Sequence, residues 1–413
     1  MGPERAGPPA AGGLSGPARL VGLDRAPLAM VSEDDQLHVI GPDGRAARAV
    51  TFSAAAGRLW GSAERGGSTW PVWSPDRRWL GCFQVADGGD PTATQVAATE
   101  VDGAEERVLL RLDDCLPVHL QWSPDGDQVA VLVQAGEQLQ LWVCALSGAP
   151  ARLIEEGAPL FFSWAEGGGR LLVHAGGAGG VGRVAIRSTT GTGEDEPLTS
   201  HAGLFTTPHA AGGSLFWSEA DGQGAALVTR AAAGGGPRVL LRSRRVLGFL
   251  PDPTGRRLAL SRAREDGRIY DGLELMMVDS GAHRLLATGP LVAFCWTPDG
   301  NALLLCRPLA PLGALRWSLL RAGDPPEAER VIGALRPTRD QLFQLRFFEQ
   351  FMRSHPPVSP DGAALTWAGF PVDPAARPGG RPEVYLADLR GDAGVQALAA
   401  GSYAVFPQAV GST

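Results

Sequence analysis

The stretch Trp122-Ser123-Pro124-Asp125-Gly126, followed by the apolar run at 129–132, decides the fold of this chain. Proline fixes φ at the first central position of a turn, aspartate accepts hydrogen bonds from nearby backbone, and glycine supplies a φ that other residues resist. A β-run enters the turn and an apolar run leaves it. The stretch therefore predicts a strand, a tight turn and a second strand.

This turn phrase recurs along most of the chain, about every 42–50 residues, with about four strand-like runs in each unit. That period is the signature of a β-propeller, in which each four-stranded sheet buries its faces against its neighbours. Further copies begin at Trp73, Trp296 and Val358, and degraded copies lie at 163–167, 205–209 and 249–252.

We predict an all-β fold, a β-propeller of eight four-stranded blades, with opening strands near 73, 122, 164, 206, 250, 296, 358 and 406. Seven blades are the alternative if a degraded unit does not form its own blade. The last strand, at 403–407, has no blade after it. It would pair with the three strands predicted within 26–52 and leave no free sheet edge. This C-terminal strand would close the ring by joining the N-terminal blade.

The domain organisation expected is a disordered tail over residues 1–17 and a single propeller over 18–413, with a helical insertion at about 333–357. In that insertion, residues 338–341 read Thr-Arg-Asp-Gln, a capping box, and the apolar spacing after it predicts one helix of about 15 residues. The insertion packs on the propeller's own face, covers the channel mouth as a lid, or docks a partner. Its apolar residues form two stripes at helical spacing: Leu342, Leu345, Phe348 and Met352, and beside them Phe343, Phe347 and Phe351.

Composition narrows the function classes. The chain is 44% apolar and 20% charged, which is enough for a sizeable core. Its net charge of −7 argues against a general nucleic-acid binder, which needs a basic face. All 37 basic residues are arginine. A Schiff-base lysine or a phosphate-loop lysine is therefore excluded.

The cysteines and the absence of long apolar runs indicate the cellular compartment in which we expect the protein. An odd number of cysteines without Cys-x-x-Cys spacing predicts buried thiols in a reducing compartment, not a disulfide framework or a zinc site. Residues 1–17 do not resemble a secretory signal, and no apolar run reaches about 18 residues. We expect a soluble, cytoplasmic protein without membrane insertion. The cysteines are Cys82, Cys115, Cys144, Cys295 and Cys306.

The turn phrase and the apolar strand after it resemble the propeller repeats of TolB and of the N-terminal domain of prolyl oligopeptidase-type peptidases. The resemblance covers about 26–408 and implies the propeller fold, but this repeat serves many functions. TolB is periplasmic and carries an extra N-terminal domain, and neither feature is visible in this sequence. Peptidases of that kind place a hydrolase domain beside the propeller. Here no Gly-x-Ser-x-Gly elbow exists, and no residues are left for such a domain.

Candidate binding residues are few. His119 and His355 each precede a turn phrase, on or beside a predicted innermost strand. They either point into the channel as ligand or metal contacts, or are hydrogen-bonded histidines at blade seams. Arg353 and Arg346 would lie on the polar side of the insertion, and Arg244 precedes another innermost strand and could add a cationic rim. The repeated aspartates and tryptophans are interpreted as turn and seam residues.

We identify no catalytic residue, no metal site and no cofactor site in the sequence. The first hypothesis is therefore a non-enzymatic soluble propeller that binds a protein or peptide through one face and the channel mouth. The first alternative is a propeller enzyme, a lyase or hydrolase acting on a sugar or peptide at a channel site. The second is a gating subunit of a separate hydrolase. Nucleic acid is not expected as a partner, and the oligomeric state stays open.

Overall fold

The computed structural model describes residues 26–33, 35–41, 48–50, 68–85, 94–103, 105–165, 167–176, 182–191, 195–203, 206–222, 224–264, 269–309, 313–323, 328–372, 380–391 and 394–409. The tail expected over residues 1–17 lies outside the described residues.

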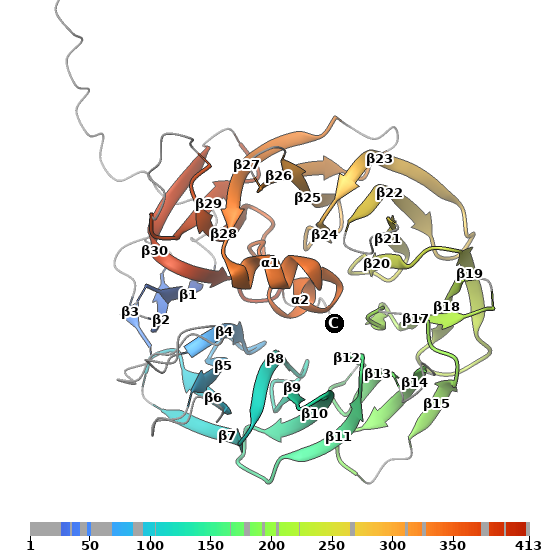
Figure 1. The fold of residues 1–413 in the computed structure, drawn as a ribbon, viewed down its shortest axis with the longest axis horizontal. Helices are drawn as coiled ribbons and strands as arrows, with labels where there is room; N and C mark the ends of the chain where they lie inside the picture. The colour runs from blue at the N-terminus through green and yellow to red at the C-terminus, as the bar shows by residue number, and fades with distance from the viewer. Residues whose placement is uncertain are drawn as a thin grey trace, which may run out of the picture.

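Antiparallel strands are the main element of the described chain. Figure 1 shows the sheets arranged around a common centre, the arrangement of a β-propeller, with α1 and α2 in that centre. Five sheets have four strands each, consecutive in sequence. They are β4–β7 (Ser68–Trp73, Trp79–Val85, Thr94–Glu100, Glu106–Leu112), β8–β11 (Cys115–Trp122, Gln128–Ala135, Gln138–Ala145, Arg152–Gly157), β12–β15 (Leu160–Trp164, Arg170–Gly176, Gly182–Ser188, Glu196–Thr199), β16–β19 (His209–Ala211, Ser214–Ala220, Ala225–Ala231, Arg238–Ser243) and β20–β23 (Leu247–Pro251, Arg257–Ala263, Tyr270–Met277, His283–Leu291).

The remaining strands form one sheet in the order β24-β25-β26-β27-β28-β29-β30-β1-β2-β3. Strand β30 pairs with two strands along different parts of its length. Glu383 of β29 pairs with Ala400, and Ala29 of β1 pairs with Val405. Residues from the two ends of the described chain are therefore hydrogen-bonded in one sheet. The bounds are β24 Ala293–Trp296, β25 Ala302–Leu309, β26 Ala314–Arg321, β27 Arg330–Pro337, β28 Ala364–Phe370, β29 Glu383–Asp388, β30 Val395–Val405, β1 Leu28–Ser32, β2 Leu37–Ile40 and β3 Arg48–Ala49.

The turn phrase forms the hairpin turn predicted from it. The Ser123 hydroxyl donates to Asp125 Oδ1 and accepts the Gln128 N–H at 3.0 Å, and Asp125 Oδ1 accepts the Asp127 N–H at 3.1 Å. Gly126 adopts a φ of +80°. The aspartate is therefore a turn residue, as predicted. The same hydroxyl-to-carboxylate bond recurs in the turns of Asp76, Asp299 and Asp361.

One degraded copy was assigned to the wrong residues. The sequence predicted a turn at 205–209, but His209–Ala211 is strand β16, and the turn falls at Gly212 and Gly213. These two glycines have φ values of +54° and +71°. They can adopt these angles without the steric cost that a side chain would add, so the turn forms there.

The tryptophans of the phrase join neighbouring sheets, which confirms their interpretation as seam residues. Each indole N–H donates to a backbone carbonyl on the adjoining innermost strand. The bonds run from Trp73 to Val405 (3.2 Å), Trp122 to Val72 (3.0 Å), Trp164 to Gln121 (3.2 Å) and Trp296 to Leu250 (3.0 Å).

A second set of bonds joins the sheets near their outer edge, and the sequence analysis missed it. Four outermost strands contain an arginine whose guanidinium donates to a backbone carbonyl in or just after a strand of the next sheet, and Arg330 of β27 makes a similar bond within the ten-stranded sheet. Each arginine is followed by Val or Leu and then by Leu or Ile, a repeat visible in the sequence. The bonds run from Arg107 to Leu146, Arg152 to Thr189, Arg238 to Val278, Arg284 to Gly323 and Arg330 to Leu389.

All five cysteines are buried free thiols, as predicted. In the part of the chain that the structure describes, no helix is long and apolar enough to cross a membrane.

Candidate functional site

The insertion between β27 and β28 contains two short helices, α1 (Arg339–Arg346) and α2 (Phe348–Ser354). Thr338 caps α1 by accepting the Gln341 N–H at 3.1 Å, as the capping box predicted. The reciprocal bond of the box is not made, because the Gln341 side chain instead accepts the N–H of Ala368. The prediction of a single helix of about 15 residues was wrong, because the backbone leaves helical geometry at Phe347 (φ −111°, ψ 37°) and two short helices form.

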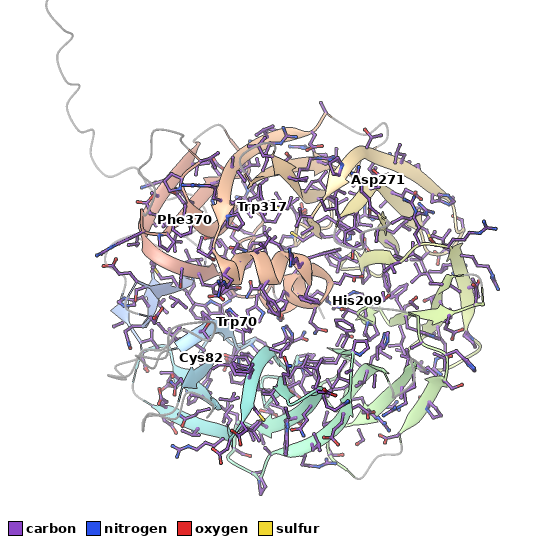
Figure 2. All side chains as sticks on the ribbon, viewed as in Figure 1. Trp70, Cys82, His209, Asp271, Trp317 and Phe370 are labelled. Carbon is purple, nitrogen blue, oxygen red and sulfur yellow. The ribbon has the colours of Figure 1, made fainter. Side chains whose placement is uncertain are left out.

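Helix α2 lies inside the ring of innermost strands and contacts opposite sides of it. The Phe351 ring lies 4.6 Å from the His119 ring of β8, and the Phe348 ring lies 4.5 Å from the Phe294 ring of β24 (centroid distances). Phe351 also contacts Trp70 of β4, which Figure 2 shows on the inner side of the ring. A helix that is apolar on opposite sides must be buried on both. The helix therefore fills part of the channel.

Polar side chains of α2 bind the inward edges of the innermost strands. Gln350 accepts the Phe162 N–H of β12 at 3.1 Å and donates to the carbonyl of the same residue at 2.8 Å. Glu349 accepts the Phe249 N–H of β20 at 2.8 Å. Burial raises the pKa of Glu349 well above its usual range. These side chains supply the partners that an inner strand edge lacks within its own sheet.

The structure brings His119 and His355 together. Their ring centroids are 5.5 Å apart, and Ser354 lies between them, with its Oγ 2.7 Å from His355 Nδ1 and 3.4 Å from His119 Nε2. All three residues are buried, each with 3% exposure or less. Burial lowers the pKa of His355 to about 3 and, with His355 nearby, that of His119 well below its usual range. Both imidazoles are therefore neutral at physiological pH.

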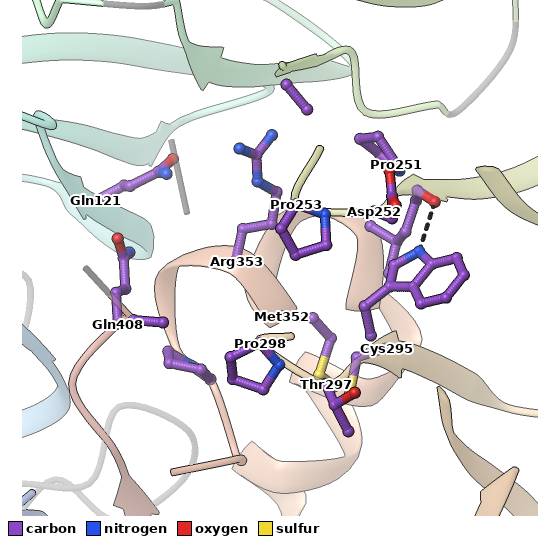
Figure 3. Close-up of a pocket in the computed structure, with 15 residues that line it drawn as sticks. Gln121, Pro251, Asp252, Pro253, Cys295, Thr297, Pro298, Met352, Arg353 and Gln408 are labelled. Atoms are coloured by element: carbon purple, nitrogen blue, oxygen red, sulfur yellow. Dashed lines mark hydrogen bonds between the residues drawn. The ribbon is translucent and has the colours of Figure 1, made fainter. Parts of the chain in front are cut away.

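The end of α2 forms the floor of a cavity of about 100 Å³. This cavity opens on the face that carries the turns between the first and second strands of the sheets, here called the turn face. Figure 3 shows Gln121 and Gln408 on one side of it and Asp252 and Cys295 on the other. Neither His119 nor His355 lines this cavity. Its lining residues are Gln121, Ala211, Leu250, Pro251, Asp252, Pro253, Cys295, Trp296, Thr297, Pro298, Met352, Arg353, Pro356, Gln408 and Ala409.

Arg353 is the one predicted binding residue in this lining. Its Nη1 donates to the Ala210 carbonyl of β16 at 2.7 Å. Burial lowers the pKa of Arg353 to about 10, which leaves the guanidinium charged at neutral pH. Burial, with the nearby Arg353 charge, also lowers the pKa of His209 well below its usual range. The cavity therefore presents a cation among proline rings and amide side chains.

The other two predicted arginines lie apart from the cavity. Arg346 is exposed in the last turn of α1, and Arg244 is exposed between β19 and β20. The sequence analysis missed Gln121 and Gln408. Gln121 directly precedes a turn phrase, but nothing in the sequence distinguishes it from its neighbours. Gln408 follows the last strand and reaches the cavity because β30 ends beside the channel, a position that depends on the tertiary fold.

No family model and no curated protein match this chain. Among solved structures, a eukaryotic initiation factor is similar at 11% identity and a TM-score of 0.52, over 93% of this chain and 99% of that one. TolB from Acinetobacter baumannii is similar at 12% identity and a TM-score of 0.42, over 73% and 78% of the two chains. The β-propeller domain of the Trilobed protease from Pyrococcus furiosus is similar at 12% identity and a TM-score of 0.44, over 72% and 86%.

Several larger hydrolases are also similar, and this chain spans 33% to 49% of their length. The similar structures thus include TolB and a protease propeller, the two kinds of protein that the turn phrase resembles. At identities this low, a match shows the fold and leaves the function open. The chain has the fold of a β-propeller, with its sheets arranged around a common centre.

Proposed function

We propose that this chain is a non-enzymatic propeller scaffold that binds a protein or peptide at the turn face, around the channel mouth. The observation that carries the proposal is the position of α2. The helix fills the inner channel and turns a half-buried guanidinium, Arg353, into the cavity at the mouth. A concave site with apolar walls and a few directed polar groups suits a ligand group that inserts into it.

Site-specific cross-linking tests this proposal. A photoreactive amino acid at Gln408, in the cavity, should capture a defined partner in cells that express the chain. The matched control places the same amino acid at Gln134, which is exposed at the opposite end of its sheet, near the β9–β10 hairpin. The proposal fails if both positions capture the same proteins, or if Gln408 captures none. Deleting residues 336–353 is a poor test, because α2 is part of the channel packing.

The proposed scaffold has eight blades within one domain, residues 18–413. In this proposal, five blades are the four-stranded sheets, and the ten-stranded sheet would divide into three more. The bridge between Val358 and Leu365 supports a short innermost strand for the blade of β28. The second half of β30 with β1, β2 and β3 would complete the ring, and the bond from Trp73 to Val405 supports that closure.

A hydrolase is the second candidate, and a single contact favours it. A hydroxyl 2.7 Å from an imidazole nitrogen, as in Ser354 and His355, has the geometry of a serine activated by a general base. Its burial beneath Phe351 weighs against this function, since substrate would have to displace α2. A fluorophosphonate probe tests it directly. Labelling of wild-type protein that disappears in Ser354→Ala would favour the hydrolase over the scaffold.

A further inference from the structure

The cavity of about 100 Å³ at the channel mouth, here called the mouth cavity, has an apolar side and a polar side. Figure 3 shows the amides of Gln121 and Gln408 on one side and Pro298, Met352 and Cys295 on the other. Burial raises the pKa of Cys295 to about 12, so its thiol is neutral and adds to the apolar side. A cavity divided in this way suits a ligand that is apolar at one end and polar at the other.

Other polar side chains in the described lining already have partners within the protein. Asp252 is fully buried and accepts from Arg257 Nε at 2.9 Å. The Thr297 hydroxyl donates within its own turn at 2.6 Å. Arg353 donates to the Ala210 carbonyl of β16 at 2.7 Å. These bonds stabilise the cavity wall, and the two glutamines are the side chains that remain for a ligand.

The amides of Gln121 and Gln408 are available because both side chains are half-buried and unpaired. Within the part of the chain that the structure describes, neither amide hydrogen-bonds to another residue. A primary amide has N–H donors and a carbonyl acceptor, and a peptide bond has one donor and one acceptor. The two kinds of group can therefore pair through both donor and acceptor. The polar side of the mouth cavity fits the backbone of a peptide.

The volume of the mouth cavity limits the side chain that can enter its apolar side. An apolar cavity of about 150 Å³ accepts benzene, which has about six carbon atoms. In proportion, a cavity of about 100 Å³ holds about four carbon atoms. A leucine side chain has that size, whereas an indole exceeds it.

We propose that the mouth cavity binds one leucine-sized aliphatic side chain of a peptide, whose adjoining peptide bonds pair with Gln121 and Gln408. This inference rests on the proposed scaffold function and names the kind of residue that the scaffold recognises. The aliphatic group leaves water as it packs against Pro298 and Met352, which supplies the free energy of binding. The two amides fix the direction of the peptide and add specificity.

Titration with blocked amino acids tests the proposal, followed by NMR of the full chain with isotope-labelled methionine methyl groups. N-acetylleucinamide should shift the methyl resonance of Met352, which Met352→Leu assigns. The resonance of Met277, which is 42% exposed on β22, should stay in place. N-acetylasparaginamide has the same branched shape with a polar end, and N-acetyltryptophanamide is too large. Each should bind at least about tenfold more weakly than N-acetylleucinamide.

Two variants test the role of the amides. Gln121→Met and Gln408→Met remove the amide and keep a side chain of similar length. Each should lower the affinity for N-acetylleucinamide about threefold to fivefold, the effect of one lost hydrogen bond. Gln134→Met is the matched control and should leave the affinity unchanged, because Gln134 is exposed at the opposite end of its sheet.

Three results would overturn the proposal: an unmoved Met352 resonance, equal affinity for N-acetylasparaginamide and N-acetylleucinamide, or glutamine variants that bind like the control. The comparison of the two blocked amino acids uses the wild-type chain, so it decides even if a variant does not fold. A partner captured through Gln408 despite such a result would leave the scaffold function standing without this inference.

Discussion

Replacing Gln350 by methionine removes both hydrogen bonds between the α2 side chain and the β12 backbone, while keeping a side chain of similar length. Gln350 is 5% exposed, and its amide accepts from and donates to Phe162 at 3.1 and 2.8 Å. The substitution leaves a buried N–H and a buried carbonyl without these partners, at a cost of about 1–3 kcal/mol each. Because methionine gains about 1 kcal/mol of favourable apolar burial, we expect α2 to be destabilised by about 1–5 kcal/mol.

Hydrogen exchange is the suitable assay, since it reports local opening of α2 separately from unfolding of the whole chain. A tenfold change in protection corresponds to about 1.4 kcal/mol, so amides of 348–355 should lose protection by at least about fivefold. Gln134→Met is the matched control, because Gln134 is exposed on β9. A loss of protection below about threefold, or an equal loss in the control, would refute the conclusion that these bonds hold the helix in the channel.

Four further outcomes follow from individual contacts. Arg77 occupies with φ +63° the position held by glycine in other copies of the turn, so Arg77→Gly should raise the free energy of unfolding by about 0.5–1 kcal/mol in urea titrations. Trp122→Phe removes the indole donor to the buried Val72 carbonyl and should lower the free energy of unfolding by about 1–3 kcal/mol. Trp142→Phe, at a half-buried site, should lower the free energy of unfolding by less. The pKa of His355 is about 3 in the folded chain and near 6.5 in the unfolded chain, so only the unfolded state binds a proton between these values and stability falls as pH falls. At pH 4.5, His355→Asn should therefore retain about 2.7 kcal/mol more of its neutral-pH stability than wild type. Equal acid sensitivity of the two proteins would count against a buried neutral imidazole. Deleting residues 400–413 exposes the core around Tyr403, Val405 and Phe406 and should cost more than about 5 kcal/mol; undiminished thermal stability would rule out closure by β30.

Local patterns predicted most of the fold. The turn phrase gave correct hairpins at Trp73, Trp122, Trp296 and Val358, since the required φ values and hydrogen bonds lie within five residues of sequence. It failed at 205–209, where Gly212 and Gly213 form the turn without any Pro-Asp signal. The arginine bonds near the outer edges of the sheets were only partly predictable, because Arg-(Val/Leu)-(Leu/Ile) begins five outermost strands but also occurs at Arg170 and Arg245, which lie elsewhere.

The candidate site was much less predictable. The sequence placed His119 and His355 on or beside predicted innermost strands, but their burial beneath Phe351 was not expected. Arg353 and Arg346 looked equivalent on the insertion, yet one lines the cavity and the other is exposed. The difference arises from the break at Phe347, which the helical periodicity of the insertion does not reveal.

By itself, the sequence determined the strand-turn-strand unit, its repetition and its seam tryptophans, because these depend on φ preferences and hydrogen bonds between residues close in the chain. The tertiary structure alone decided what fills the channel and which residues line the cavity at its mouth. Gln350 meets Phe162 across 188 positions, and Arg353 meets Ala210 across 143. Contacts at such separations depend on how the sheets are placed around their common centre, and no local pattern encodes that placement.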